Sequence, residues 1–165
     1  MRRADQHRNQ LIRTIAWALL VLVVVGTGII YWQAAAPLND AKKSAVAMAE
    51  KYGKLKSTSA FYWYNRQQTY YTVAGKNQAN QSVYVMVAQK GGHINIYQQS
   101  SGITSQQAQQ TVKSSQHPRK IVKTAFGKWK KQAVWEVTYV NKNGRMCYTL
   151  LSFKNGSLVK TIQNI

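Results

Sequence analysis

Residues 133–158 read AVWEVTYVNKNGRMCYTLLSFKNGSL, and this stretch decides the fold. Its first eight residues are dominated by β-branched and aromatic side chains, as strands prefer. Asn143-Gly144 and Asn155-Gly156 are strong signals for tight turns between antiparallel strands. The stretch therefore predicts a strand, a turn, a second strand over 145–153, and a turn that leads into a third strand.

The same order of elements occurs twice in the chain. A run of helix-forming residues is followed each time by strand-like runs, which are rich in aromatic and β-branched residues. The predicted helices cover residues 41–52 and 106–115. The predicted strands cover 60–64, 69–74, 82–88 and 94–98 in the first half, and 120–126, 133–140, 145–153 and 158–162 in the second.

An offset of 64 residues aligns the two halves without a gap. It places Val73 on Val137, Tyr84 on Tyr148 and Gly92 on Gly156. We therefore expect an α+β fold with two small repeats, 37–102 and 103–165. Each repeat would have one helix packed on an antiparallel sheet of three to four strands.

The two helices differ in their expected packing. Asn39 or Asp40 is available to cap the first helix, and Thr104 or Ser105 the second. The second helix is rich in glutamine, so we expect it to dock lightly on its sheet. The first carries apolar residues at helical spacing on one face, namely Ala45, Met48, Ala49 and Tyr52.

A long apolar run precedes both repeats. It extends without interruption from Ile15 to Trp32, which is ample for the roughly 20 residues that cross a bilayer as a helix. Arginines dominate residues 1–13, and basic flanks stay on the cytoplasmic side. We therefore expect a basic cytoplasmic tail over 1–13, a single-pass transmembrane anchor over 14–36, and an extracytoplasmic domain over 37–165.

A cleaved signal peptide is the alternative interpretation of this run. Ala34-Ala35-Ala36 has the small residues that a cleavage site requires. The apolar core is longer than that of a signal peptide, and cleavage after Ala36 would leave Pro37 as the first residue. We expect the anchor to stay uncleaved.

Charge is the second strong signal. Beyond residue 36 there are 19 Lys and Arg residues against three acidic residues, a net charge of +16. Inside a cell this charge would suggest nucleic acid, whereas outside the cell the available polyanions are teichoic acid and anionic lipid, so we favour these two over nucleic acid. The predicted anion contacts surround Trp129, where lysines and an aromatic ring alternate. They are Lys120, Lys123, Lys128, Lys130 and Lys131.

Aromatic side chains concentrate in the first two strands of the first repeat. Alternation sends Phe61 and Trp63 to one face of the sheet and their neighbours to the other. One face is needed for the core, while the rest is available as a platform for a protein partner. The predicted partner surface consists of Tyr62, Tyr64, Tyr70 and Tyr71.

The sequence offers no catalytic constellation. Its histidines, His7, His93 and His117, are far apart in sequence and lack a second ligand at metal-binding spacing. Glu136 lies within a strand, where a solvated face or an ion pair with a lysine is the ordinary role. Cys147 alternates with its neighbours as a buried apolar residue does. We expect no catalytic, cofactor or metal site, and hence a protein that is not an enzyme.

The stretch that decides the fold resembles the PepSY pattern. That pattern has an aromatic-Glu-Val strand, a glycine turn, a second strand and another glycine turn, which correspond to residues 135–137, 143–144, 146–150 and 155–158. Ser152-Phe153 stand where the pattern often has an acidic residue. The departure weakens the analogy with PepSY propeptides, which inhibit peptidases.

The whole layout resembles the TseB (YpmB-like) family. The resemblance rests on the basic tail, one anchor, the helix that contains AVAMAE at residues 45–50, and two PepSY-like repeats. It implies a Gram-positive membrane protein that acts in cell-wall elongation by binding a class B penicillin-binding protein, a transpeptidase. Two alternatives stay open, a basic module that binds an anionic polymer such as teichoic acid or DNA, and an inhibitor of an extracytoplasmic peptidase.

Overall fold

The computed structural model describes the backbone of residues 2–163, and the side chains of this range except those of residues 2–12, 14 and 31–37. The predicted basic tail and both ends of the predicted anchor therefore include side chains outside the described residues. The chain divides into two units, residues 1–40 and residues 41–165. Both repeats lie in the second unit.

Helix α1 runs without interruption from Arg2 to Gly53. The expected helix start at Asn39 or Asp40 is therefore wrong, because the backbone is already helical before it. Within the first unit, the large apolar side chains between Ile15 and Ile30 are exposed. Among the residues that the structure describes, no helix is both long enough and apolar enough to cross a membrane.

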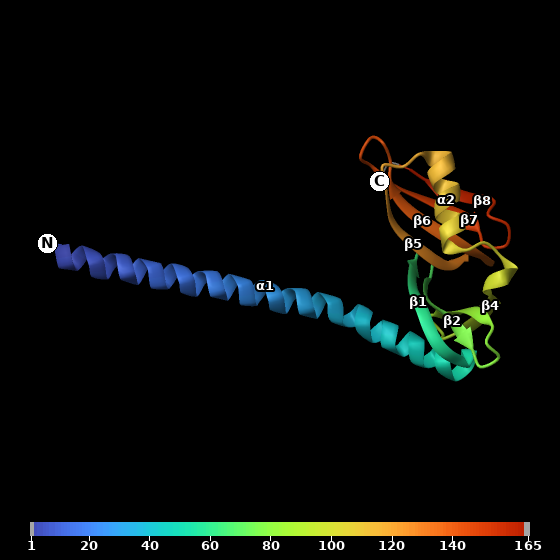
Figure 1. Cartoon of the computed structure of the whole chain (residues 1–165), viewed down its shortest axis with the longest axis horizontal. Coiled ribbons are helices and arrows are strands. Elements are labelled where there is room, and N and C mark those ends of the chain that lie inside the picture. The colour runs from blue at the N-terminus through green and yellow to red at the C-terminus, as the bar shows by residue number, and fades with distance from the viewer. Residues whose placement is uncertain (1, 164–165) are drawn as a thin grey trace. The chain divides into compact units, whose positions relative to one another are not determined.

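Two four-stranded antiparallel sheets follow α1 in the chain (Figure 1). Each is a meander, in which every strand pairs with the next one along the sequence. The first sheet contains β1 (Leu55–Asn65), β2 (Thr69–Asn77), β3 (Ser82–Ala88) and β4 (Ile94–Gln98). A short 3-10 helix, η1 (Gln99–Ser101), and α2 (Ser105–Gln116) lead to the second sheet of β5 (Lys120–Trp129), β6 (Gln132–Val140), β7 (Met146–Ser152) and β8 (Leu158–Ile162).

The internal repeat predicted from the 64-residue offset is confirmed by these bounds. Shifting β3 and β4 by 64 residues gives the bounds of β7 and β8 without any adjustment. Shifting β1 and β2 gives β5 and β6 to within one residue. Each repeat is thus one helix and four strands, at the upper end of the expected three to four.

The last three turns of α1 cover one face of the first sheet. Ala45 and Ala49 are buried there against Val73, Val83 and Val85. The predicted apolar stripe is correct for these two alanines. It is wrong for Met48 and Tyr52, which are 38% and 56% exposed, because the small alanine side chains bring the helix close to the sheet and turn the larger side chains outward.

Helix α2 covers one face of the second sheet. Thr104 caps its N-terminus in a capping box with Gln107, as the threonine prediction required. Ala108 and Val112 are fully buried despite the polar composition of the helix. Trp135 donates its indole N–H to the carbonyl of Ile103, which fixes the chain just before the cap. The helix is therefore firmly docked, and the expectation of light docking is wrong.

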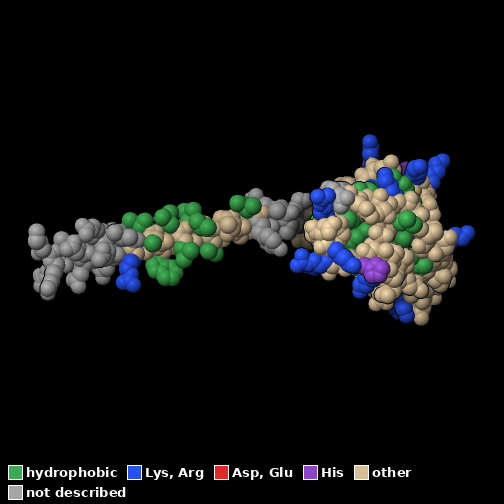
Figure 2. Space-filling model, turned by 90° about the horizontal axis from the view of Figure 1, so that it is seen from above, with side chains coloured by type: hydrophobic (Ala, Val, Ile, Leu, Met, Phe, Trp, Pro, Cys, Tyr) green, Lys and Arg blue, Asp and Glu red, His purple; other side chains and the backbone are tan. Residues whose placement is uncertain are grey.

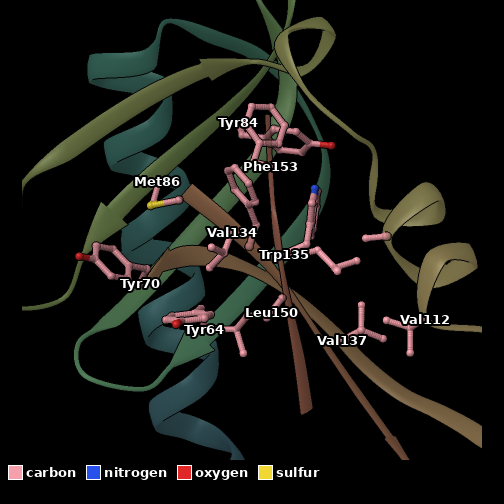
Figure 3. Close-up of a cluster of buried hydrophobic side chains, with 14 of the residues drawn as sticks. Tyr64, Tyr70, Tyr84, Met86, Val112, Val134, Trp135, Val137, Leu150 and Phe153 are labelled. Carbon is pink, nitrogen blue, oxygen red and sulfur yellow. The ribbon is translucent and has the colours of Figure 1, made fainter. Parts of the chain in front are cut away.

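The two repeats share one large core. The first sheet contributes Tyr64, Tyr84 and Met86 from the face opposite α1, and the second contributes Trp135 and Phe153. Figure 3 shows these side chains gathered between strands of both repeats. Most of their rings meet edge-on or tilted, the geometry that aromatic pairs favour.

The edge of the second sheet is protected by this packing. β5 is an edge strand, and its unpaired backbone groups would otherwise be open to another chain. The buried hydroxyl of Thr72, in the middle of β2, donates a hydrogen bond to the carbonyl oxygen of Phe126 in β5, at 3.0 Å. The face of the first sheet thus covers the edge of the second and provides a hydrogen-bond donor for one of its unpaired carbonyl groups.

Candidate functional site

The lysines predicted to contact anions do not form one cluster. Lys120 lies at the start of β5, whereas Lys130 and Lys131 form the turn after it. At roughly 3.3 Å per residue, about 30 Å of strand separates the two ends. Lys128 points to the first repeat, where its ammonium donates to the Asn95 side chain at 2.7 Å. On the face that Figure 2 shows, Lys and Arg are spread over the folded unit rather than gathered in one patch.

The predicted tyrosine surface is wrong for Tyr64 and Tyr70. These side chains are 0% and 7% exposed, because they form the packing surface between the repeats. Tyr62 is half-buried in the same interface, edge-on to Trp135. Tyr71 points to the opposite face of the sheet and stacks with Phe61 next to α1. The four tyrosines therefore do not make an exposed platform.

A buried ion pair joins the repeats. Arg66 lies in the turn between β1 and β2, and its guanidinium donates to the carboxylate of Glu136 in β6. Glu136 is 5% exposed, so its carboxylate is largely removed from water and has Arg66 as its ion-pair partner. The same guanidinium lies over the ring of Tyr148 in β7, 3.9 Å from its centroid. Of the two ordinary roles considered for Glu136, an ion pair is the one observed, but its partner is an arginine and not the expected lysine.

The charge of Glu136 also affects the pKa values of two neighbouring side chains, Tyr64 and Lys123. Burial is the main cause that raises the pKa of Tyr64, and the negative charge of Glu136 raises it further. Its hydroxyl has no hydrogen-bond partner among the described residues. Partial desolvation lowers the pKa of Lys123, against the opposing effect of the Glu136 carboxylate. The junction between the repeats therefore holds a polar cluster that is buried around Glu136 and open to solvent at Lys123.

The pairing register shows which face of the second sheet carries this cluster. Directly opposed residues of antiparallel strands point to the same face. One row across the sheet contains Lys123, Thr138, Tyr148 and Ile162, and the next contains Ala125, Glu136, Leu150 and Lys160. Trp135 and Val137 alternate with Glu136 and point to α2 instead. The cluster therefore lies on the face that α2 leaves uncovered.

Three cations on or beside this face rest on aromatic rings. Besides Arg66 on Tyr148, the Lys123 ammonium lies 5.0 Å from the centroid of the Trp63 ring, and the Lys160 ammonium lies 4.6 Å from that of Trp129. We call this surface the cation–aromatic face. It is defined by Trp63, Arg66, Lys120, Lys123, Trp129, Met146, Tyr148 and Lys160.

The predicted lysines contribute unequally to this face. A bulge at Val122 puts Lys120 and Lys123 on the same side of β5, so both belong to it. Lys128, Lys130 and Lys131 do not. The sequence alone missed Arg66, because 70 residues separate it from Glu136 and no local pattern connects the two. The alternation of side chains along a strand was the sequence signal that could have placed Tyr148 and Lys160 on this face.

The titratable groups with catalytic potential are paired, enclosed or far from one another. The Glu136 carboxylate is held by Arg66. Cys147 is 1% exposed, so its thiol is shielded from solvent. His93 and His117 are exposed in separate turns. Within the described part of the chain, no group of three or more His, Cys, Asp or Glu side chains is arranged to hold a metal ion.

The first repeat has an apolar groove of about 260 Å³ between α1 and its sheet. It is lined by Ala45, Met48, Tyr71 and Val87. A more polar hollow of about 320 Å³ lies beside β3 and β4, lined by Gln81, Ser82, Gln98 and Ser100. Neither contains a charged side chain in its lining.

Comparison with known proteins points to one family. A family model described as the cell wall elongation regulator TseB-like domain matches residues 44–88. A Bacillus subtilis protein named "Probable cell wall elongation regulator TseB" is 26% identical over 158 residues, which cover 94% of this chain and 98% of that protein. These matches support similarity to the TseB/YpmB-like family.

A solved TseB/YpmB-like structure has the same fold. The YpmB protein from Bacillus subtilis superposes with a TM-score of 0.64 over 73% of this chain and 95% of that one, at 24% identity. The family model ends within the first repeat, at Ala88. The curated relative extends the TseB-like correspondence over the second repeat, which carries most of the cation–aromatic face.

Proposed function

We propose that this protein is a non-enzymatic, membrane-anchored accessory protein of cell-wall elongation, which binds and regulates a class B penicillin-binding protein. The observation that carries the proposal is the end-to-end similarity to the Bacillus subtilis protein named as a probable cell wall elongation regulator. The similarity covers both repeats and the apolar stretch before them, so it concerns the whole arrangement rather than one module.

The anchor is part of the proposal. The exposed apolar side chains between Ile15 and Ile30 surround the helix instead of forming one stripe, which suits a lipid environment. An anchor over 14–36 would keep residues 37–165 at the outer face of the membrane. Confinement raises the effective concentration of the domain near a membrane-bound partner.

The state of the reactive groups supports an accessory role. Glu136 cannot act as a general base while Arg66 holds its carboxylate, and Cys147 is too enclosed to attack a substrate. The rigid shared core of the two repeats favours a binding scaffold. Regulation would then act through contact with the transpeptidase.

A gene deletion tests the proposed function, with complementation by two matched variants. In one variant an unrelated transmembrane helix replaces residues 14–36, and in the other a cleavable signal peptide replaces residues 1–36. We expect the first to restore cell length and wall synthesis and the second to fail. Normal elongation in the deletion strain would contradict the role, and full rescue by the released domain would contradict the need for a tether.

A second candidate function is binding to an anionic wall polymer. The second repeat carries eleven Lys and Arg residues against Glu136 alone, and Lys130 and Lys131 are exposed in one turn. This function predicts binding to purified teichoic acid that weakens steeply with salt, and more so after neutralisation of Lys128, Lys130 and Lys131. An affinity for teichoic acid that does not change with salt concentration would contradict this second function.

A further inference from the structure

The cation–aromatic face is open over much of its area. Helix α2 covers the opposite face of the second sheet, and the β1–β2 turn covers the region around Glu136. Beyond that turn, Trp63 is 36% exposed and Met146 38% exposed. Lys120, Lys123 and Lys160 are exposed as well. Apolar surface and positive charge therefore lie side by side on a sheet face that no helix covers.

Three of the four cations of this face are positioned by aromatic rings. Lys123 and Lys160 rest on the indole rings of Trp63 and Trp129, and Arg66 rests on Tyr148. A side chain that is positioned before binding loses less conformational entropy when a partner arrives. These contacts favour a partner with negative groups at defined positions over a diffuse ionic atmosphere.

The chain supplies almost no negative charge to this face. Glu136 is the only acidic residue in 103–165, and its carboxylate is already paired with Arg66. Lys120, Lys123 and Lys160 form no ion pair within the described residues. Charge complementarity therefore calls for an acidic ligand.

We infer that the cation–aromatic face is a docking surface for an acidic segment of a protein partner. The inference rests on the proposed function, in which the partner is a membrane-bound transpeptidase. Carboxylates of the segment would meet Lys120, Lys123 and Lys160, and its apolar side chains would cover Met146 and Trp63.

The residue composition of the face favours a protein ligand over a polyol phosphate such as teichoic acid. Trp, Tyr and Arg are the residues that most often dominate the energy of protein interfaces, and Met is enriched in them. A polyol phosphate can neutralise the lysines, but it has no apolar side chains to cover the exposed rings and Met146. A protein segment with alternating acidic and apolar residues satisfies both.

Charge reversal of the full-length, tagged chain tests the surface in cells. Lys123→Glu with Lys160→Glu should reduce the amount of captured penicillin-binding protein about tenfold or more, because two attractive contacts become repulsive. The matched control is Lys76→Glu with Lys113→Glu, which changes the net charge equally at exposed positions off this face. It should capture as much as the wild type. Equal losses in both variants would overturn the inference in favour of a diffuse charge effect.

Site-specific photocrosslinking gives a second readout that needs no charge change. A photoreactive residue at Met146 should form crosslinks to an acidic segment of the partner. The control position is Ile96, an exposed apolar residue on β4 of the first sheet. The Lys123→Gln variant, which avoids a new charge next to Glu136, should lower the yield from Met146 only. Unfolding midpoints of all variants show that they are folded.

The outcomes separate this inference from the proposed function. Crosslinks from Met146 to an acidic segment of another protein would support the surface and contradict the transpeptidase as partner. Capture of a penicillin-binding protein that is equal in all variants, without crosslinks from Met146, would overturn the surface and leave the proposed function intact. Crosslinks to lipid or teichoic acid alone would also overturn it.

Discussion

The ring of Tyr64 lies directly on the backbone of Gly127, so closely that a Cβ atom at residue 127 would overlap the ring. Tyr64 belongs to β1 of the first repeat and Gly127 to β5 of the second. The contact brings the face of one sheet against the edge strand of the other. Together with the hydrogen bond from Thr72 to Phe126, it explains why the two repeats form one folded unit.

Substitution Gly127→Ala should therefore destabilise the fold. Forcing a methyl group into a filled core typically costs about 1–3 kcal/mol, because neighbours must shift. In a Tyr64→Ala background the same substitution should cost much less, since the obstructing ring is gone. Urea unfolding of the four proteins in this double-mutant cycle measures the difference. An equal cost in both backgrounds would show that the ring is not the obstacle.

The buried ion pair gives an asymmetric prediction. Arg66→Met leaves the Glu136 carboxylate buried without its partner. Breaking a fully buried pair in this way costs about 3–5 kcal/mol, and because the Arg66 side chain is 21% exposed we expect a loss at the lower end of this range. The double variant Arg66→Met with Glu136→Leu should recover most of that loss, because no uncompensated charge remains. Chemical unfolding at neutral pH provides the measurement. A double variant as unstable as the single one would contradict this account of the pair.

Thr72 offers a test of the protected sheet edge. Thr72→Val removes the donor to the Phe126 carbonyl while it keeps the shape of the side chain. An unsatisfied buried acceptor costs about 1–3 kcal/mol, so the free energy of unfolding should fall by that amount. Thr72→Ser keeps the hydroxyl and serves as the control. If both variants lost the same stability, packing rather than the hydrogen bond would be responsible.

The repeat and its strands were predictable from the sequence, whereas their docking was not. Turn pairs such as Asn143-Gly144 and the 64-residue offset are local signals, and they located all eight strands. The contact of Arg66 with Glu136 joins residues that are 70 positions apart, and nothing in either segment specifies it. The same limit explains why Tyr64 and Tyr70 were wrongly predicted to be exposed. Alternation placed Tyr64 on a face, but a second sheet rather than solvent or partner covers it.

Alkaline pH should weaken the shared core. Burial raises the pKa of Tyr84 from 10.0 to about 12. Because the folded-state pKa lies above the unfolded value, the contribution of this tyrosine is fully present below pH 10 and is lost as the pH rises from about 10 to about 12. Tyr84→Phe should flatten the decline of stability over this window, whereas Tyr52→Phe on the exposed side of α1 should not. Urea unfolding at a series of pH values decides between the two results.

Cys147 should be inert in the folded protein. Its side chain is 1% exposed in the core, and thiol reactivity requires access to the thiolate. A thiol-specific reagent should therefore label it only after denaturation. Cys147→Ala removes the labelling signal and identifies the residue. Rapid labelling under native conditions would mean that β7 opens readily, against the packing described above.

Capture of the partner from intact cells tests whether the protein binds a class B penicillin-binding protein. Intact cells that express the full-length tagged chain are crosslinked, the protein is purified from the membrane, and its partners are identified by mass spectrometry. We expect recovery of a class B penicillin-binding protein, in an amount that exceeds recovery with an unrelated domain on the same anchor. Equal recovery with that control, or no penicillin-binding protein in either sample, would contradict it.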